Sequence, residues 1–421
     1  MSNHILIIGG GVIGLCTAYY AAKRGHRVTL IERLPREREG CSFGNAGMIV
    51  PSHFIPLAAP GAVALALRWM WNPESPLYIQ PRLDWDLISW GWKFLRASTR
   101  EHVRRAAPLI RDLSFASRAC FETLAETLDF GLVKRGLLML CKTQHALDEE
   151  AKTAALANQL GVPAEVLGAK AVAALDPAVR MDVVGGVHFP KDCHLSPGRL
   201  MAALQRELES AGVEFHFESV VTGWRADGRR VEAVKTNAGD FAADEFVLCG
   251  GAWSPTVARD LRVRLPTQAG KGYSLTLARP RQLPQMCAIF SEARIAVTPM
   301  AGANAEGATL RFGGTMEIAG LDERINARRV QGIIKAVPRY FPDFTAEDFA
   351  GIQPWSGLRP CSPDGLPYVG RFAAYENFST ATGHAMMGLS LGPVTGKIMA
   401  GLLSGEPPSF DLALLSPDRF A

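Results

Sequence analysis

The apolar and polar positions at the start of the chain predict a strand, a glycine turn, a helix and a second strand. Residues 4–8 form an apolar run, and an alanine-rich apolar stripe after Gly14 is typical of a helix packed closely on a sheet. A second apolar run covers residues 28–31 and ends at Glu32. This order predicts the beginning of a parallel α/β sheet.

Residues 62–130 carry helical periodicity and many aromatic side chains. Pro73, Pro76 and Pro81 are expected to break this stretch into separate helices. Two interpretations stay open for the aromatic side chains, packing inside the protein and contact with a membrane surface. The tryptophans concerned are Trp69, Trp71, Trp85, Trp90 and Trp92.

Farther along, a helical pattern returns at about 145–160, and Ser196 followed by Pro197 predicts the N-cap and first turn of another helix. Residues 213–249 alternate apolar and polar side chains and predict strands. No internal repeat or low-complexity linker separates these segments, so we expect interleaved domains. With 421 residues, the chain is long enough for about two to three of them.

Charge and cysteine usage narrow the possible classes. The 45 Lys and Arg nearly balance the 41 Asp and Glu and are scattered, so no nucleic-acid partner is expected. The densest basic stretch, residues 96–111, is either a solvated helix face or a surface for anionic lipid. The eight cysteines include no C-x-x-C pair, so no metal is expected, and their apolar settings suit reduced thiols of a cytoplasmic protein.

The first turn carries a nucleotide-binding pattern, because Gly9, Gly11 and Gly14 have G-x-G-x-x-G spacing. Gly9 permits the tight turn, Gly11 lets a pyrophosphate approach the backbone, and Gly14 brings helix and strand close together. Glu32, 18 residues after Gly14, is placed to accept hydrogen bonds from a ribose. These features predict a dinucleotide site and leave the choice between NAD and FAD open.

Two later segments favour FAD. Residues 245–254 form an apolar strand that stops at two glycines, as when backbone passes close to a bound ligand. Residues 378–404 predict a strand, a glycine-rich turn and a helix that begins between Gly388 and Pro393. Such a helix N-terminus would stabilise negative charge on a reduced flavin ring.

At this point the chain resembles a known family. The motifs are GGGVIG with Glu32, SFGNAG at 42–47, VLCGGAWS at 247–254, GLRPCSPDGLP at 357–367 and ATGHAMMGLSLGP at 381–393. Together they resemble the FAD-dependent D-amino-acid oxidase superfamily, most closely its bacterial D-amino-acid dehydrogenases and, among these, D-hydroxyproline dehydrogenases. The resemblance runs through essentially the whole chain in order.

The resemblance implies an α/β fold in which a glutathione-reductase-like (Rossmann-type) FAD-binding domain is interleaved with an α+β substrate domain containing an antiparallel sheet. It places the FAD-binding domain at about 1–60, 190–266 and 352–421, and the substrate domain at 61–189 and 267–351. The implied cofactor-binding residues are Gly9, Gly11, Val12, Ile13, Gly14, Glu32, Arg33, Ser42, Asn45, Ala46, Gly47, Met48, Val220, Gly250, Trp253, Gly383, His384, Gly388, Leu389 and Ser390.

For the substrate site, the resemblance implies that Arg359 holds a carboxylate through a bidentate guanidinium pair. The alternative is an arginine that caps carbonyls at a domain junction. Tyr273 is either a second donor to that carboxylate or a strand aromatic with its hydroxyl at the surface. His53 is placed to reach the substrate amine or a ring substituent, or is an ordinary polar histidine. His384 is expected to orient the turn beside the cofactor and not to act as a base.

The implied reaction is hydride transfer from Cα of a D-amino acid, cis-4-hydroxy-D-proline or D-proline, to flavin, which yields the imine. Related sarcosine oxidases attach FAD to a cysteine where Gly357 stands here, and Cys361 lies a few residues later, so non-covalent FAD is expected.

A broad D-amino-acid dehydrogenase is the second interpretation; an FAD-binding module without amine oxidation and an NAD-dependent dehydrogenase also stay open. The expected electron acceptor is of the quinone or respiratory-chain type, and the expected location is cytoplasmic, with peripheral attachment to the inner membrane left open.

Overall fold

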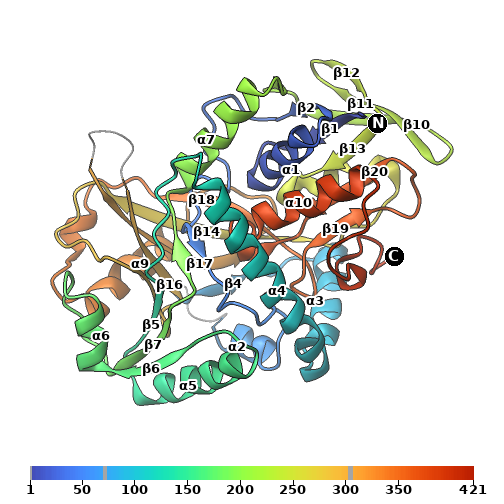
Figure 1. Ribbon diagram of the computed structural model, residues 1–421. Coiled ribbons are helices and arrows are strands. Elements are labelled where there is room, and N and C mark those ends of the chain that lie inside the picture. Colours follow the sequence, from blue (N-terminus) through green and yellow to red (C-terminus); the bar gives the residue numbers. More distant parts are fainter. Residues whose placement is uncertain (1, 70–73, 302–306) are drawn as a thin grey trace.

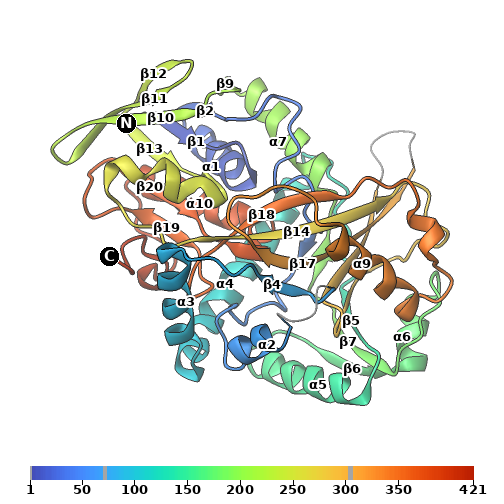
Figure 2. The ribbon, with the colours of Figure 1, turned by 180° about the vertical axis from the view of Figure 1, so that it is seen from behind.

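A computed structural model describes residues 2–69, 74–301 and 307–421 (Figure 1). Its helices are α1 (Val12–Lys23), α2 (Ala62–Trp69), α3 (Trp85–Ala97), α4 (Arg100–Leu124), α5 (Gln144–Gln159), α6 (Ala169–Leu175), α7 (Pro197–Ser210), α8 (Ser254–Val257), α9 (Ala327–Tyr340) and α10 (Gly392–Leu403). They are distributed around two large sheets, which differ in strand direction and meet near the middle of the molecule (Figures 1 and 2).

The first sheet has six strands in the order β19-β20-β13-β1-β2-β9, and all neighbours are parallel except β19 and β20. Helices α1, α7 and α10 pack together on one face of it, and α4 lies beside α10 (Figure 1). The Rossmann-type prediction is therefore confirmed. The strands are β1 (His4–Ile8), β2 (Arg27–Ile31), β9 (Glu214–His216), β13 (Glu245–Leu248), β19 (Tyr368–Arg371) and β20 (Phe378–Thr382).

The second sheet has nine strands in the order β18-β14-β17-β16-β15-β5-β7-β6, with β4 paired to β17. Most neighbours are antiparallel, as predicted, while β15–β5 and β17–β4 are parallel. The strands are β4 (Leu77–Ile79), β5 (Leu137–Cys141), β6 (Glu165–Gly168), β7 (Gly185–Phe189), β14 (Gln268–Leu277), β15 (Cys287–Phe290), β16 (Ile295–Met300), β17 (Thr309–Ile318) and β18 (Trp355–Cys361).

Smaller pairings complete the chain. Strands β10 (Val221–Asp227), β11 (Arg230–Thr236) and β12 (Gly239–Ala242) form a three-stranded sheet, and β3 (Met48–Ile49) pairs with β8 (Cys193–His194). The strands of the first sheet all fall in the three segments expected for the FAD-binding domain. Strand β18 also falls in the last of these segments, yet it is an edge strand of the second sheet, so the chain crosses between the sheets there.

The structure adds detail to two local predictions. Residues 62–130 do contain separate helices, but β4 lies between α2 and α3; Trp71 and Pro73 lie outside the described residues. Ser196 occupies the N-cap position of α7, as predicted, but its side chain makes no capping hydrogen bond. Its hydroxyl donates to the carbonyl of Ala301 at 2.9 Å, which orients it toward another part of the chain.

The contact between α1 and α10 generates a test of packing. A Cβ at Gly396 of α10 would lie 2.4 Å from the carbonyl carbon of Cys16 in α1. Backbone cannot give way as a side-chain end can, so Gly396→Ala is expected to lower the free energy of unfolding by about 1–3 kcal/mol. Urea denaturation of the holoprotein measures it. Gly198→Ala in α7, where nothing lies within 4 Å, is the matched control and should be neutral or stabilising. If both substitutions changed the free energy of unfolding equally, α1 and α10 would be able to move apart at Gly396 without loss of stability.

Candidate functional site

A cavity of about 1280 Å³ lies between the two large sheets. It begins at the carboxyl ends of β1 and β2, where Gly9 and Glu32 line it, and continues to Thr315 of β17 and Arg359 of β18. Ligands of open α/β sheets bind at the carboxyl ends of the strands. The cavity therefore combines the expected nucleotide position with the wall of the antiparallel sheet.

The glycine turn has the geometry of a phosphate cradle. Gly9 has φ +110°, and a Cβ at Gly14 would lie 1.9 Å from the carbonyl oxygen of Gly9, so helix and strand are in direct backbone contact. The Ser42 hydroxyl accepts a hydrogen bond from the amide of Val12 at 3.0 Å, in the first turn of α1. Val12 and Ile13 line the cavity. The N-terminus of α1, the positive end of its dipole, thus borders the space where a pyrophosphate is predicted.

Glu32 is fixed by the turn that it follows. One carboxylate oxygen accepts the Gly10 amide at 2.6 Å and the other accepts the Leu34 amide at 2.9 Å. Arg38, which the sequence analysis did not single out, donates to the Gly10 carbonyl at 2.8 Å. Ribose binding by Glu32 stays a prediction; Glu32 lines the cavity next to the glycine turn.

Arg33 and Trp253, two predicted residues far apart in the sequence, meet at the same end of the cavity. The Arg33 guanidinium lies 3.6 Å from the centre of the Trp253 ring and 3.7 Å from the Glu323 carboxylate. Val220 and Gly250 also line this end. A cation stacked on an indole forms a flat wall that suits an aromatic base.

The loop at residues 42–48 is held from the second sheet. The buried guanidinium of Arg311, in β17, donates to the carbonyls of Phe43 at 3.0 Å and Asn45 at 2.8 Å. Burial lowers the pKa of Arg311 to about 10. The Asn45 side-chain oxygen accepts the amide of Gly47 at 2.9 Å, so this oxygen stabilises the loop itself. Arg311 was missed because its loop partners lie more than 260 residues away along the chain.

The third predicted motif forms the opposite wall. His384 Nε2 is 3.0 Å from the Thr395 hydroxyl in the first turn of α10, and burial lowers the pKa of His384 to about 3. The histidine therefore connects the turn to the helix and stays neutral, which fits the orienting role predicted for it. The Ser390 hydroxyl accepts the amide of Val50 at 3.1 Å and connects this turn to the 42–50 loop.

Most predicted cofactor residues line the cavity, and four lie behind its surface. Those that line it are Gly9, Gly11, Val12, Ile13, Glu32, Arg33, Ser42, Asn45, Ala46, Met48, Val220, Gly250, Trp253, His384, Gly388 and Leu389. The four behind it are Gly14, Gly47, Gly383 and Ser390. Gly14 and Ser390 have contacts given above, and Gly47 and Gly383 are in left-handed conformations against neighbouring backbone or ring atoms. These four shape the walls.

Arg359 lies at the other end of the cavity, facing an edge of β14. Its Nη1 donates to the Thr315 carbonyl at 2.8 Å, and a Cβ at Gly272 would come within 2.2 Å of the guanidinium, so this glycine makes the space that Arg359 fills. Burial lowers the pKa of Arg359. Among the described residues, no carboxylate is within ion-pair distance of it. The guanidinium therefore keeps unused donors and, within the described structure, has no ion-pair partner.

Thr315 is a second polar group at this end that sequence reasoning missed. Its backbone has φ +63°, an uncommon conformation for a β-branched residue, and its side-chain oxygen is buried without a hydrogen-bond partner in the described structure. Thr315 also lines the cavity. Thr315 therefore shapes this wall and holds Arg359 through its carbonyl, while protein atoms cover its own hydroxyl.

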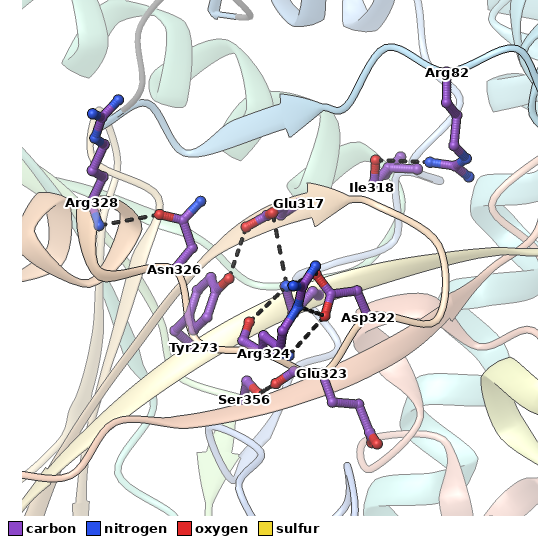
Figure 3. A network of polar contacts seen from close by, with 11 residues as sticks. Arg82, Tyr273, Glu317, Ile318, Asp322, Glu323, Arg324, Asn326, Arg328 and Ser356 are labelled. Carbon is purple, nitrogen blue, oxygen red and sulfur yellow. Dashed lines mark hydrogen bonds and ion pairs between the residues drawn. The ribbon is translucent and has the colours of Figure 1, made fainter.

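Tyr273 does not join Arg359. In the β14–β18 ladder Gly270 is opposite Arg359 and Tyr273 is opposite Ser356, and since side chains alternate between the faces of a sheet, Tyr273 and Arg359 point to opposite sides. The buried Tyr273 hydroxyl donates to the Glu317 carboxylate at 2.8 Å (Figure 3). The alternative of a surface hydroxyl was therefore wrong. Tyr273 does line the cavity, but the hydroxyl predicted to donate to the substrate carboxylate donates to Glu317 here.

Tyr273 and Glu317 belong to a larger polar cluster that includes Asp322 and Arg324 (Figure 3). The ammonium group of Lys271, 1% exposed, lies 3.8 Å from Glu317 and 3.6 Å from Asp322, and it donates to the Arg324 carbonyl at 2.8 Å. Burial and the neighbouring Glu317 raise the pKa of Tyr273. This cluster neutralises itself, and it lies on the far side of β14 from Arg359.

His53 lines the cavity and is connected to the protein interior. Its Nδ1 lies 2.9 Å from the Ser52 hydroxyl, which donates to the buried Asp192 carboxylate at 2.5 Å. Burial raises the pKa of Asp192 to about 7, while burial and Arg294 lower that of His53 to about 4. Neither Ser52 nor Asp192 was predicted, because only the β3–β8 pairing brings residues 140 positions apart together.

Comparisons with known proteins agree with an FAD-binding fold. The family model of the FAD-dependent oxidoreductases (DAO) matches residues 4–402. A D-amino acid dehydrogenase of Bradyrhizobium diazoefficiens is 33% identical over 428 residues, covering 99% of both chains. One of Methylobacterium radiotolerans is 35% identical over 426 residues, covering 98% of this chain and 99% of the relative.

Solved structures agree with the fold. Glycine oxidase of Geobacillus kaustophilus superposes with a TM-score of 0.79 at 25% identity, covering 100% of this chain and 99% of its own. L-Proline dehydrogenase of P. horikoshii superposes with a TM-score of 0.73 at 17% identity, covering 100% and 98%. The second likeness supports the fold alone.

The residues present fit FAD. The lining residues run from the glycine turn and the N-terminus of α1 to the small-residue loop at 42–48. A Cβ at Gly14 would close the turn. Non-covalent attachment stays a prediction. Burial raises the pKa of the Cys41 thiol, and that of Cys361 to about 12, so both stay protonated and are weak nucleophiles. Within the described part of the chain, no group of His, Cys, Asp and Glu forms a metal site.

Proposed function

The chain belongs to the FAD-dependent oxidoreductase (DAO) family, and we propose that it dehydrogenates a D-amino acid, with cis-4-hydroxy-D-proline or D-proline as the preferred substrate. The name shared by the relatives, D-amino acid dehydrogenase, supports the reaction class. A broad D-amino-acid dehydrogenase is the second candidate, because those names specify no single amino acid. The proposed product is the imine, which stays cyclic for a proline-type ring.

One observation carries the proposal, the guanidinium of Arg359 without a carboxylate partner in the described structure. Burying a cation without a counter-charge is unfavourable, so the arrangement is expected to persist for a ligand that brings the negative charge. An amino acid carboxylate fits the guanidinium fork in a bidentate manner.

The remaining walls suit an amino acid with an apolar ring. Bound FAD supplies the two-electron acceptor for the hydride of Cα. The chain contributes orientation through Arg359 and a cavity from which apolar side chains exclude water. These apolar side chains are Met48, Val50, Met139, Ile289 and Ala296. His53 adds one polar group that is placed for an amine or a ring hydroxyl.

A substrate panel tests the proposal. Anaerobic mixing of the yellow holoprotein with cis-4-hydroxy-D-proline, D-proline, D-alanine, their L-forms, sarcosine and glycine should bleach the flavin fastest with the proline-type D-amino acids. Similar rates for D-alanine would favour the broad enzyme. No bleaching by any of these compounds, with flavin present, would favour an FAD-binding module without amine oxidation; a colourless protein would point to NAD.

Arg359→Lys tests the carboxylate assignment. Lysine keeps the charge but cannot form the bidentate pair, so kcat/KM should fall about 10- to 100-fold, the loss of one charge-assisted hydrogen bond of about 1.5–3 kcal/mol. Steady-state kinetics with the best substrate measure it. The control is Arg371→Lys, which changes a guanidinium paired with Glu245 outside the cavity and should leave kcat/KM unchanged. An unchanged Arg359→Lys enzyme would place the carboxylate elsewhere.

We further propose that α3 contacts an anionic membrane surface, where a quinone-type acceptor would be met. The helix buries Trp90, whose indole donates to the Cys361 carbonyl at 2.8 Å, and leaves Trp85 83% and Trp92 61% exposed. Packing thus accounts for one of these tryptophans. Ile88 and Leu95 complete the exposed stripe at helical spacing. Within the described residues, no helix is both long and apolar enough to cross a bilayer.

Charge and position support that proposal. Exposed basic side chains follow the stripe at the end of α3 and the start of α4, namely Arg96, Arg100, Arg104 and Arg105. Tryptophan with nearby basic residues favours the interface of an anionic bilayer. Helix α3 lies at the periphery of the molecule in both views (Figures 1 and 2), and Leu95 also lines the cavity.

Vesicle binding tests the α3 surface. Replacing Trp85 and Trp92 by Gln should reduce co-sedimentation with vesicles of anionic lipid at least several-fold, because the apolar contact area is lost. The matched control replaces Val166 and Leu321, which are 48% and 45% exposed elsewhere, and should bind like the wild type. Equal binding of both variants, or no binding of the wild type, would remove the membrane from the proposal.

A further inference from the structure

Three polar groups form a hydrogen-bonded chain from the protein interior to the cavity. Asp192 immediately precedes β8, and Ser52 and His53 follow β3, so the pairing of these two short strands brings them together. The Ser52 amide donates to Asp192 Oδ1 at 3.1 Å and its hydroxyl to Oδ2 at 2.5 Å. The same hydroxyl oxygen lies 2.9 Å from His53 Nδ1. The three side chains are therefore in continuous hydrogen-bond contact.

We propose that Asp192, Ser52 and His53 form a proton relay that accepts a proton from the ammonium group of the bound substrate. This inference rests on the proposed function, because hydride can leave Cα only when the neighbouring nitrogen has a free electron pair. His53 is the catalytic residue of the relay, and Ser52 and Asp192 are its positioning residues. The relay supplies the neutral amine that the reaction consumes.

The transfer balances without an additional reactant. The substrate N–H⁺ bond breaks and the proton joins His53 Nε2, the Nδ1 proton passes to the Ser52 oxygen, and the Ser52 proton passes to the Asp192 carboxylate. The substrate becomes a neutral amine, Asp192 becomes a carboxylic acid, and His53 changes only its tautomer. The proton returns by the reverse route when product has left.

The electrostatics of the site favour this route. Burial and Arg294 hold the pKa of His53 at about 4, so the imidazole does not retain an additional proton near neutral pH. Burial raises the pKa of Asp192 to about 7, so its carboxylate takes up a proton near neutral pH. A relay that ends on Asp192 avoids an imidazolium in the cavity, and a general acid or base works best with a pKa near the working pH.

The groups around the relay do not replace it. Arg118 of α4 lowers the pKa of Asp192 slightly against the effect of burial, and Arg294 faces His53. The nearby thiols of Cys193 and Cys287 stay protonated near neutral pH, because burial raises the pKa of Cys193 to about 12 and that of Cys287 well above its usual value. Asp192 is thus the member of this cluster that titrates near 7.

His53 and Arg359 both line the cavity, and we infer from the residues between them that they face one space. Arg294 acts on His53, and its carbonyl is 3.4 Å from the position that a Cβ of Gly314 would take. Thr315 follows directly and accepts the hydrogen bond from Arg359. This continuous set of neighbours places the amine acceptor and the carboxylate donor around one space, as an α-amino acid requires.

Rapid-reaction kinetics test the relay. Flavin reduction in the wild-type holoprotein should accelerate as pH rises through about 7, as Asp192 loses its proton. Asp192→Asn and Ser52→Ala should each slow reduction about 10²-fold and abolish this pH dependence, with little change in KM. Ser52→Thr keeps the hydroxyl and should restore both. Retention of the pH profile in Asp192→Asn would overturn the relay.

Asp176→Asn is the matched control. Asp176 is a buried carboxylate that accepts the Gln285 amide at 2.7 Å and the Met286 amide at 3.1 Å, and burial raises its pKa, but it does not line the cavity. The control should lose stability without changing the pH profile of reduction. A changed profile in this variant would assign the effect to general destabilisation and overturn the relay.

Histidine tautomers give a readout that needs no turnover. In ¹⁵N-histidine spectra of the holoprotein, the His53 signal, assigned by its loss in His53→Gln, should change from Nε2–H to Nδ1–H as pH rises through about 7. Ser52→Ala should remove the change. If no D-amino acid reduces the flavin, the proposed function fails, but this titration still tests the relay. A tautomer that does not change with pH overturns the relay. A change that is present in the wild type and lost in Ser52→Ala supports it.

Discussion

The uncompensated positive charge of Arg359 is the constraint around which this site is organised. A guanidinium at this depth is unfavourable unless its donors are satisfied, and the described structure gives it one carbonyl, that of Thr315. Strand β14 contributes Gly272, where any side chain would displace the guanidinium. The positively charged wall is therefore built by backbone and glycine, without an acidic partner that would cancel its attraction for a carboxylate.

The opposite wall depends on the loop that joins the two sheets. Residues 42–50 leave the nucleotide-binding sheet, and Arg311 fixes their carbonyls from the second sheet while Ser390 holds the amide of Val50. These contacts come from two distant parts of the chain. The loop can thus be rich in small residues, which bring backbone close to a flavin, and still have a defined position.

Much of the first sheet could be predicted because its information is local. The turn from Gly9 to Gly14 and the acid at Glu32 encode strand, helix and strand in adjacent residues, and the structure reproduces that order. The residues around the substrate end could not be found in this way. Thr315, Arg311 and Asp192 look ordinary in their own segments and acquire a role only through strand pairing across the molecule.

The position of Tyr273 shows that a sequence motif does not reveal the register in which its strand pairs. Tyr273 and Arg359 are both near the cavity, yet one step along β14 changes the face to which a side chain points. Sequence resemblance indicates which strands are present. Whether a residue faces the ligand depends on whether it occupies an odd or an even position along its strand.

The same desolvation acts in opposite directions on neighbouring groups of the cavity. It lowers the pKa of His53 and His384, since it disfavours their cations, and it raises the pKa of Asp192, since it disfavours the anion. At neutral pH both imidazoles are neutral, and Asp192 is divided between its two forms. Arg359 and Arg294 keep their positive charge, so a ligand's carboxylate fixes its orientation on Arg359 while its amine faces groups that exchange protons readily.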